Sequence, residues 1–257
     1  MTSLAKIVNE LDSLLGTEGF PDYKEALNGL QVETRADIMK VAAAVDLRER
    51  TIDGAKAHGA NLLLVHHGLF WSGLRPLRGA QFRRIHALLA SGIAVYSSHL
   101  PLDAHPEIGN NVLLARELGL TPSASFARFE SIDIGVRGES SIATAELIAS
   151  ADTIARRWGG VARNSPVEPH RMTKRWAICT GGGATATTLR EAAENGVDTL
   201  IVGEGPHWTA VEADEMEIVV IYAGHYATET FGVRALADFV GRTFDLPTVF
   251  IDVPTGL

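Results

Sequence analysis

The sequence lacks the features of several protein classes. Its 257 residues include a single cysteine, Cys179, so no disulfide can form within the chain, and a reducing cytoplasm is the simplest expectation. No stretch approaches eighteen uninterrupted apolar residues, and the charged residues of the N-terminal segment argue against a secretory signal, so neither a membrane span nor secretion is expected.

Basic residues are also few. The 23 lysines and arginines stand against 31 acidic residues, which gives a formal net charge of −8. Nucleic-acid-binding proteins usually carry a basic face, so the charge balance argues against nucleic acid as the main partner and leaves a local patch as the alternative. The chain is 46% hydrophobic, enough for a substantial core, and the composition is that of an ordinary globular protein.

Short apolar runs alternate with amphipathic stretches, which is typical of an α/β fold. The apolar residues near the N-terminus recur at helical spacing from Leu4 to Leu15. Strands are expected at residues 41–45, 61–65, 93–97, 132–136, 176–180, 199–202, 218–222 and 248–251. Further helices are expected at residues 49–58, 81–91, 109–118, 144–158, 189–195 and 230–242.

Three segments of the first half match three of the second half in the same order. AKAHGANLLLVHHG (55–68) parallels AAENGVDTLIVGEG (192–205), VAAAVD (41–46) parallels WAICTG (176–181), and the YSSH segment ending at His99 parallels the YAGH segment ending at His225. Chance similarity of helix–strand units is the alternative. We predict an internal duplication into two related α/β halves, residues 1–126 and 127–257, with a metal site between them.

Potential metal ligands follow the predicted strands. His66 and His67 come directly after an apolar run, where a histidine pair taken alone is more often a solvated turn. His99 and Asp103 follow the next strand, and His225 and Glu229 repeat this spacing of four in the second half. Each pair alone would be read as a cap or a surface interaction. Together, at the carboxyl ends of strands, they indicate a centre for two divalent cations.

The motifs LLLVHHGLFW, YSSHLPLDAHPEIGNN and AGHYATET resemble those of the Nif-three-like family of dinuclear metal-centre hexameric proteins, also known as GTP cyclohydrolase I type 2 homologues. ALNGLQV (26–32), VAAAVD and VGEGPHWTA (202–210) support the resemblance, which covers nearly the whole chain; relatives carry Asp-Asn where this chain has Leu27-Asn28. The resemblance implies that Glu229 bridges two cations. It also implies that the metal ligands are His66, His67, Asp103, His225 and Glu229.

The implied function is that of a metal-dependent hydrolase, with a nucleotide, GTP, as the possible substrate. Zinc, iron, manganese, cobalt and nickel all remain open, since no thiolate ligand selects among them. His99, Glu204 or His207 could move the proton in catalysis. The resemblance further implies a homohexameric ring. The alternative is a non-catalytic ring that stores or delivers metal, or that regulates or binds a partner.

Two further features carry weaker signals. The glycines Gly181–Gly183 lie between a strand and a helix and could contact phosphate, but a tight turn that needs positive φ explains them at least as well. Cys179 falls in a predicted buried strand, where it should behave as a small apolar residue.

Overall fold

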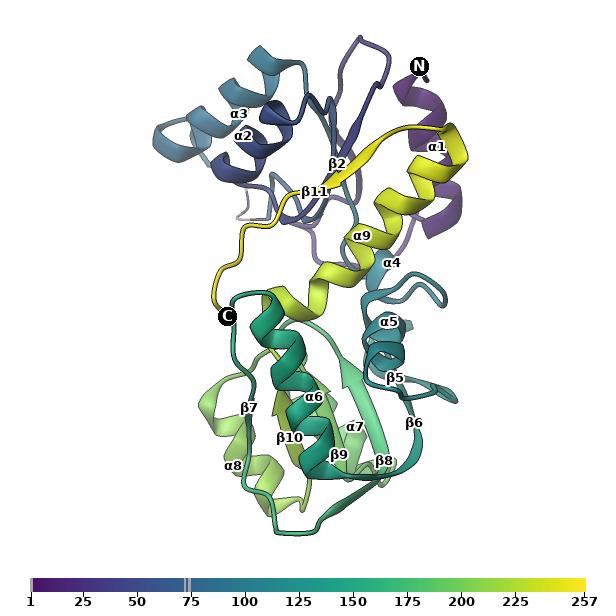
Figure 1. Cartoon of the computed structure of the whole chain (residues 1–257), viewed down its shortest axis with the longest axis vertical. Helices are drawn as coiled ribbons and strands as arrows, with labels where there is room; N and C mark the ends of the chain where they lie inside the picture. The colour runs from purple at the N-terminus through teal and green to yellow at the C-terminus, as the bar shows by residue number, and fades with distance from the viewer. Residues whose placement is uncertain (1, 72, 74) are drawn as a thin grey trace. The chain divides into compact units, whose positions relative to one another are not determined.

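The computed structural model describes every residue except 1, 72 and 74, and the chain forms two compact units (Figure 1). Unit 1 contains residues 1–102 and 232–253, and unit 2 contains residues 103–231 and 254–257. The boundary that we expected after residue 126 is not a boundary between these units. It falls inside strand β5 (Ala124–Phe129), which belongs to unit 2.

Unit 1 is built on a five-stranded sheet with the order β1-β4-β3-β2-β11. Neighbouring strands are parallel throughout except for β1, which runs antiparallel to β4 at one edge. The central strands β2 and β3 consist mainly of buried Val, Ala and Leu, as expected for a parallel sheet covered on both faces. The strands are β1 (Gly29–Val32), β2 (Val41–Asp46), β3 (Leu62–His67), β4 (Ala94–Ser97) and β11 (Thr248–Phe250).

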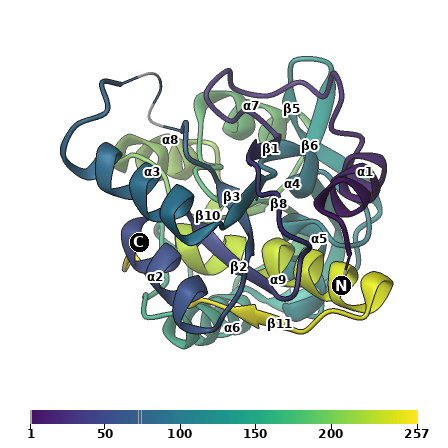
Figure 2. The ribbon, with the colours of Figure 1, turned by 90° about the horizontal axis from the view of Figure 1, so that it is seen from above.

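Helices cover both faces of this sheet. Helices α2 (Glu49–Ala57) and α3 (Gly79–Ser91) lie on one face, and α1 (Leu4–Leu15) and α9 (His225–Phe244) lie on the other (Figures 1 and 2). The helix expected at the N-terminus is confirmed, because Leu4, Ile7, Leu11 and Leu15 are its buried residues and recur every three or four positions. Helix α9 begins in unit 2 and belongs to unit 1 from Gly232 onward.

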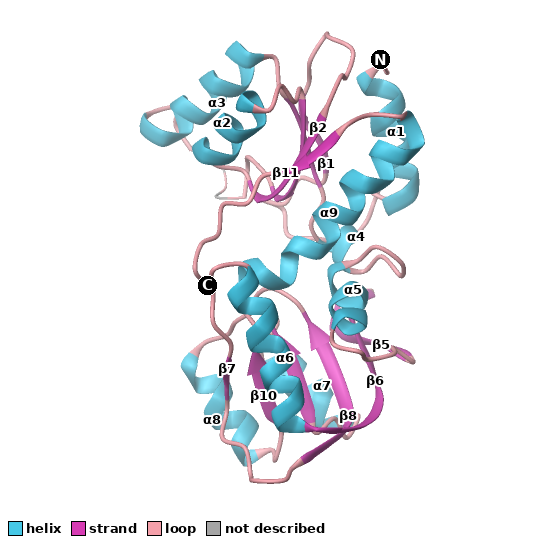
Figure 3. Ribbon diagram, viewed as in Figure 1, coloured by secondary structure: helices cyan, strands magenta, loops and turns pink. Residues whose placement is uncertain are grey.

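Unit 2 contains a six-stranded sheet with the order β5-β6-β8-β9-β10-β7, in which β8, β9 and β10 are parallel (Figure 3). Helices α5 and α6 pack on one face through Leu114 and Leu147, and α7 and α8 pack on the other through Leu189 and Ala213. The elements not yet given are α4 (Leu100–Asp103), α5 (Asn110–Glu117), β6 (Ile132–Ala143), α6 (Thr144–Arg157), β7 (Arg163–Asn164), β8 (Met172–Cys179), α7 (Ala186–Glu194), β9 (Thr199–Val202), α8 (His207–Glu215) and β10 (Val219–Tyr222).

The predicted α/β class is confirmed, and each expected strand and helix is present with shifted ends. Strand β3 continues through His67 instead of ending at Val65, and α9 begins at His225 rather than Thr230. The sequence reading missed β1, β5, β7, α4 and α8, which are short or carry no clear periodicity. The duplication stays a prediction. Among the described residues, no helix combines the length and the apolar character needed to cross a bilayer.

Candidate metal ligands

Three histidine side chains gather in unit 1, two from the last residues of β3 and one from the segment just after β4. The ring centroids of His66 and His67 are 4.8 Å apart, and that of His99 lies 4.9 Å from His66 and 5.6 Å from His67. One ring nitrogen from each lies within 4.8 Å of the other two. All three residues are at most 9% exposed. Buried imidazoles this close could hold a metal ion together.

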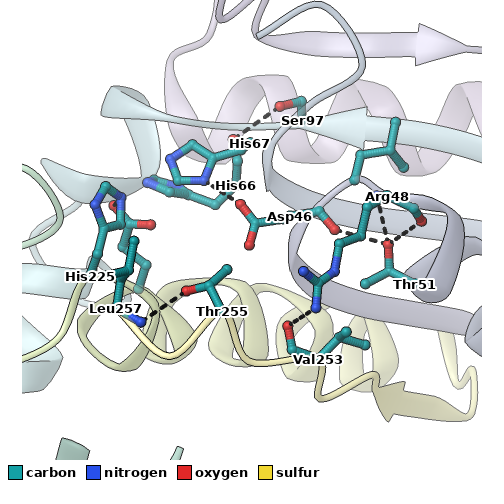
Figure 4. Close-up of polar contacts among 12 residues, drawn as sticks. Asp46, Arg48, Thr51, His66, His67, Ser97, His225, Val253, Thr255 and Leu257 are labelled. Atoms are coloured by element: carbon teal, nitrogen blue, oxygen red, sulfur yellow. Dashed lines mark hydrogen bonds and ion pairs between the residues drawn. The ribbon is translucent and has the colours of Figure 1, made fainter. Parts of the chain in front are cut away.

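Each of these rings has an acceptor at Nδ1. His66 Nδ1 lies 2.9 Å from the carbonyl oxygen of Ser98, and His67 Nδ1 lies 2.9 Å from Asp46 Oδ1 (Figure 4). His99 Nδ1 lies 2.8 Å from Asp22 Oδ1. Since a carbonyl or carboxylate oxygen can only accept, Nδ1 is the donor in each of these bonds, and Nε2 is the ring atom left to face a metal. This is the arrangement in which a histidine binds metal through Nε2.

The loop before β1 holds His99 in place. Asp22 accepts hydrogen bonds from the Asn28 side chain at 2.7 Å and from the Leu100 backbone N–H at 2.9 Å, besides the bond from His99. Asn28 in turn accepts the backbone N–H of His99 at 2.7 Å. Burial acts to raise the pKa of Asp22, but these bonds and the charge of His99 outweigh it and lower the pKa below its usual value.

Gln31 connects the same loop to the segment after the two histidines. Its side chain accepts the Leu69 backbone N–H at 2.7 Å and donates to the carbonyl oxygens of Ala26 and Leu27 at 3.0 Å. A Cβ atom at Gly68 would clash with the Gln31 amide, so the glycine allows this close contact. The motif ALNGLQV thus supports the imidazole cluster through hydrogen bonds.

Asp103, at the end of α4, belongs to unit 2 and is 7% exposed. Its Oδ1 accepts a hydrogen bond from the Asn110 side chain at 2.8 Å and a longer one from the Thr180 hydroxyl at 3.4 Å. Asn111 donates to the Asp103 carbonyl oxygen at 3.2 Å and accepts the backbone N–H of Thr180 at 2.8 Å. Asn110 and Asn111 therefore fix the carboxylate beside the end of β8.

His225 and Glu229 lie one turn apart at the start of α9. His225 Nε2 is 3.1 Å from Glu229 Oε1, and His225 Nδ1 is 2.8 Å from Glu204 Oε1. Burial acts to lower the pKa of His225, but the two carboxylates outweigh it and raise the pKa to about 9. The ring is therefore protonated at neutral pH without a cation, and a cation at Nε2 would take the place of that proton.

The glycine loop after β8 makes room for Glu229. Gly181 has a φ of +62°, and a Cβ atom there would clash with Glu229 Oε1 and lie 3.4 Å from His225 Nε2. Its backbone N–H donates to the Thr228 hydroxyl at 3.1 Å. A tight turn with positive φ therefore accounts for Gly181, whereas phosphate contact at Gly181–Gly183 stays a prediction.

The predicted site residues thus form one set in each unit. Unit 1 brings His66 and His67 together with His99, and unit 2 joins His225 to both Glu229 and Glu204. His207 is exposed at the first position of α8. The sequence reading missed the residues that hold the ligands, namely Asp22, Asn28, Gln31, Asp46, Asn110, Asn111 and Thr180. Several of them lie inside motifs noted above, and this was the available signal.

The donors fit a divalent transition metal. Neutral imidazole suits zinc, copper, iron and nickel, and carboxylates suit harder cations such as manganese. The hydrogen bond from each of these histidines to a carboxylate or carbonyl oxygen is the arrangement usually found around a bound metal. The chemistry and orientation of these side chains are therefore such that they could hold a metal ion.

Comparison with known proteins gives one consistent result. A protein named "GTP cyclohydrolase 1 type 2 homolog" from Pyrococcus horikoshii is 40% identical over 252 residues, covering 98% of each chain, and one of the same name from Archaeoglobus fulgidus is 39% identical over 255 residues, covering 99% of this chain and 100% of its own. The crystal structure of TTHA1606 from Thermus thermophilus matches over 100% of both chains with 35% identity and a TM-score of 0.84. The family model Duf34/NIF3 (NGG1p interacting factor 3) matches residues 2–256, so this chain belongs to the Duf34/NIF3 family.

Proposed function

We propose that this protein binds two divalent cations per subunit and is a metal-dependent hydrolase. The proposed ligands are His66, His67, Asp103, His225 and Glu229, with Glu229 shared by the two cations. This extends what each unit displays separately, three imidazoles in unit 1 and carboxylates with one imidazole in unit 2. Zinc, iron, manganese, cobalt and nickel are the candidate metals.

One observation carries the proposal. Three buried imidazoles have ring nitrogens within 4.8 Å of one another, and all three point Nδ1 at an oxygen acceptor. A purely structural histidine needs neither this clustering nor a common orientation. Protonating several rings so close together would cost electrostatic free energy, whereas a cation bound to Nε2 of His66 and His67 would replace protons on those rings and leave His99 beside them to move a proton.

When bound, the cations would activate water and polarise the bond to be broken. The chain itself would position the ligands and move protons. Glu204 accepts a hydrogen bond from His225 Nδ1 and has a side chain that is 44% exposed, so it can orient the ring and exchange protons with solvent. His99 and His207 are the other candidates for proton transfer.

The substrate we propose is a nucleotide, on the basis of the name that the relatives carry, in which GTP is the compound acted on. We also propose a homohexamer and a cytoplasmic location, the latter because a lone buried thiol suits a reducing compartment. Mass measurement by light scattering tests the assembly: six times the monomer mass is expected, and a monomer would contradict it.

The function is tested by elemental analysis of the purified protein, followed by an activity screen with GTP, other nucleotides and phosphoesters. Two equivalents of transition metal, and turnover that is lost on chelation and in His67→Ala, are expected. His58→Ala is the matched control, because His58 is an exposed histidine of unit 1 that lies outside the cluster. Bound metal without turnover of any compound would overturn the hydrolase and favour storage, delivery or regulation.

A further inference from the structure

Two large aromatic side chains stand beside the imidazole cluster of unit 1. The ring centroid of Trp71 lies 4.5 Å from that of His99 and 4.9 Å from that of His67. Tyr23 lies 6.0 Å from His99 and meets Trp71 edge to face, with centroids 6.2 Å apart and an interplanar angle of 82°. The candidate metal ligands therefore have an aromatic border.

This border is exposed although the imidazoles are buried. Trp71 is 37% exposed and Tyr23 is 53% exposed, whereas His99 is 7% exposed. Aromatic side chains of this size contribute most to the free energy of binding when they become buried. Their rings can also stack on another planar group or meet it edge to face. An uncovered aromatic pair next to buried ligands is thus a surface suited to a ring that approaches the cluster.

The aromatic pair lies close in the sequence to the residues whose hydrogen bonds orient the imidazoles. Tyr23 directly follows Asp22, whose carboxylate accepts from His99 and from the Leu100 backbone N–H. Trp71 lies two residues after Leu69, whose backbone N–H donates to Gln31. The backbone close to each ring is therefore anchored by the residues that orient the candidate ligands, and the rings themselves contact His99.

The surrounding sequence has an unusual charge. Residues 54–102 contain no Asp or Glu, although the chain has 31 of them, and this stretch carries five Lys and Arg residues. Two of these, Arg75 and Arg78, are exposed and follow Trp71 closely in the chain. A locally positive segment in an acidic protein favours a ligand that carries negative charge.

We propose that Trp71 and Tyr23 form a stacking surface for the planar base of a nucleotide, and so set the substrate class of the unit 1 site. This inference rests on the proposed function, since it takes the imidazole cluster as the place of the chemistry. Stacking of a base on an aromatic side chain tolerates different bases, because every base has a π face. We therefore expect selection for a planar heteroaromatic ring rather than for guanine alone.

The test is calorimetric titration of the metal-loaded protein with three probes: guanosine, which has the ring without charge, inorganic triphosphate, which has charge without a ring, and GTP. Trp71→Leu should weaken guanosine and GTP binding by about tenfold, the size expected for one stacking contact, and leave triphosphate binding unchanged. Trp71→Phe keeps a ring and should lose less. Phe82→Leu is the control, because Phe82 is 53% exposed in the same unit and stacks on His86 instead.

The outcomes separate this inference from the proposed function. Guanosine that fails to bind the native protein, or binds Trp71→Leu equally well, overturns the stacking surface even if metal and turnover are present. Guanosine binding that depends on Trp71, in a protein without turnover, supports the stacking surface and contradicts the proposed hydrolase activity. Thermal unfolding and metal content of each variant must match the native protein, and Tyr23→Leu, with an independent loss of guanosine affinity, is the second variant if Trp71→Leu fails to fold.

Discussion

Units 1 and 2 contain the same arrangement of three parallel strands. In unit 1 the order along the chain is β2-α2-β3-α3-β4, and in unit 2 it is β8-α7-β9-α8-β10. A candidate ligand follows the third strand in both, His99 after β4 and His225 after β10. The middle strand differs, since β3 ends in His66 and His67 whereas β9 is followed by Gly203 and Glu204.

The surroundings of the ligands differ in a way that follows from their charge. Unit 1 surrounds imidazoles with hydrogen-bond acceptors, such as Asp46 beside His67. Unit 2 offers donors to a carboxylate, such as the Asn110 amide beside Asp103. An acceptor at Nδ1 fixes the orientation of a histidine ring so that Nε2 can face a metal, and donors hold a carboxylate in place. Similar strand ends can therefore present neutral or anionic ligands, depending on which polar side chains lie behind them.

The largest expected effect comes from removing one ligand in either unit. His67→Ala in unit 1 and Glu229→Ala in unit 2 should each lower the metal content by about one equivalent, and turnover by roughly 100-fold or more. Both changes are measured by elemental analysis and steady-state kinetics, with His58→Ala as the control. If substitution in only one unit lowers the metal content and turnover, the ligands come from that unit alone and the two sets do not act together.

A smaller effect is expected from the residues that orient the rings. Asp46→Ala removes the acceptor of His67 and should weaken metal binding by about 10- to 100-fold, whereas Asp46→Asn keeps an acceptor and should lose less. Glu204→Ala should cost less than Asp46→Ala, because the Glu204 side chain is 44% exposed against 28% for Asp46. Competition with a chromogenic chelator measures both affinities, and Asp53→Ala, an exposed acid on α2, is the control. Equal affinities in all these variants would remove the orienting role.

The positions of the strand ends could be predicted from the sequence because each one changes from an apolar run to a polar pair. His66 and His67 follow LLLV, and His225 and Glu229 open an amphipathic segment, so the pattern alone placed the candidate ligands beside the sheets. The α/β class followed from the same alternation. Both signals come from residues that are close together in the sequence, and such local patterns predict secondary structure well.

The partners of these ligands could not be predicted in the same way. Asp22 lies 77 positions before His99, and Asn111 lies 69 positions before Thr180, so neither pairing has a periodicity that the sequence displays. The extension of β3 through His67 also depends on pairing with Asp46 of β2, a tertiary contact. The bounds of the compact units could not be predicted from the sequence either, since unit 1 joins the N-terminal residues to a segment near the C-terminus.

Glycine substitutions in the two units should differ moderately in their effect on the free energy of unfolding. Gly181→Ala places a methyl group against Glu229 at a residue with positive φ, and should lower the free energy of unfolding by about 2 kcal/mol. Gly182→Ala points into open space and should change it by less than about 0.5 kcal/mol. Gly68→Ala, in unit 1, places its methyl group against the Gln31 side chain, which can rotate away at the cost of its hydrogen bonds to Ala26, Leu27 and Leu69, about 1 kcal/mol each. Urea unfolding measures all three, and a neutral Gly181→Ala would refute the close contact with Glu229.

The smallest effect concerns the thiol of Cys179, which should be unreactive in the native protein. Cys179 is 4% exposed at the end of β8, and burial, together with the carboxylates of Asp103 and Glu229, raises the pKa of its thiol far above the usual value. A thiol-reactive disulfide reagent should therefore label less than about a tenth of the folded protein in the time that labels the unfolded protein fully. Because Cys179 is the single cysteine of the chain, labelling reports the opening of unit 2 alone. Faster labelling in Glu229→Ala than in His67→Ala is thus expected, and equal rates would mean that unit 2 does not depend on its own carboxylate for local stability.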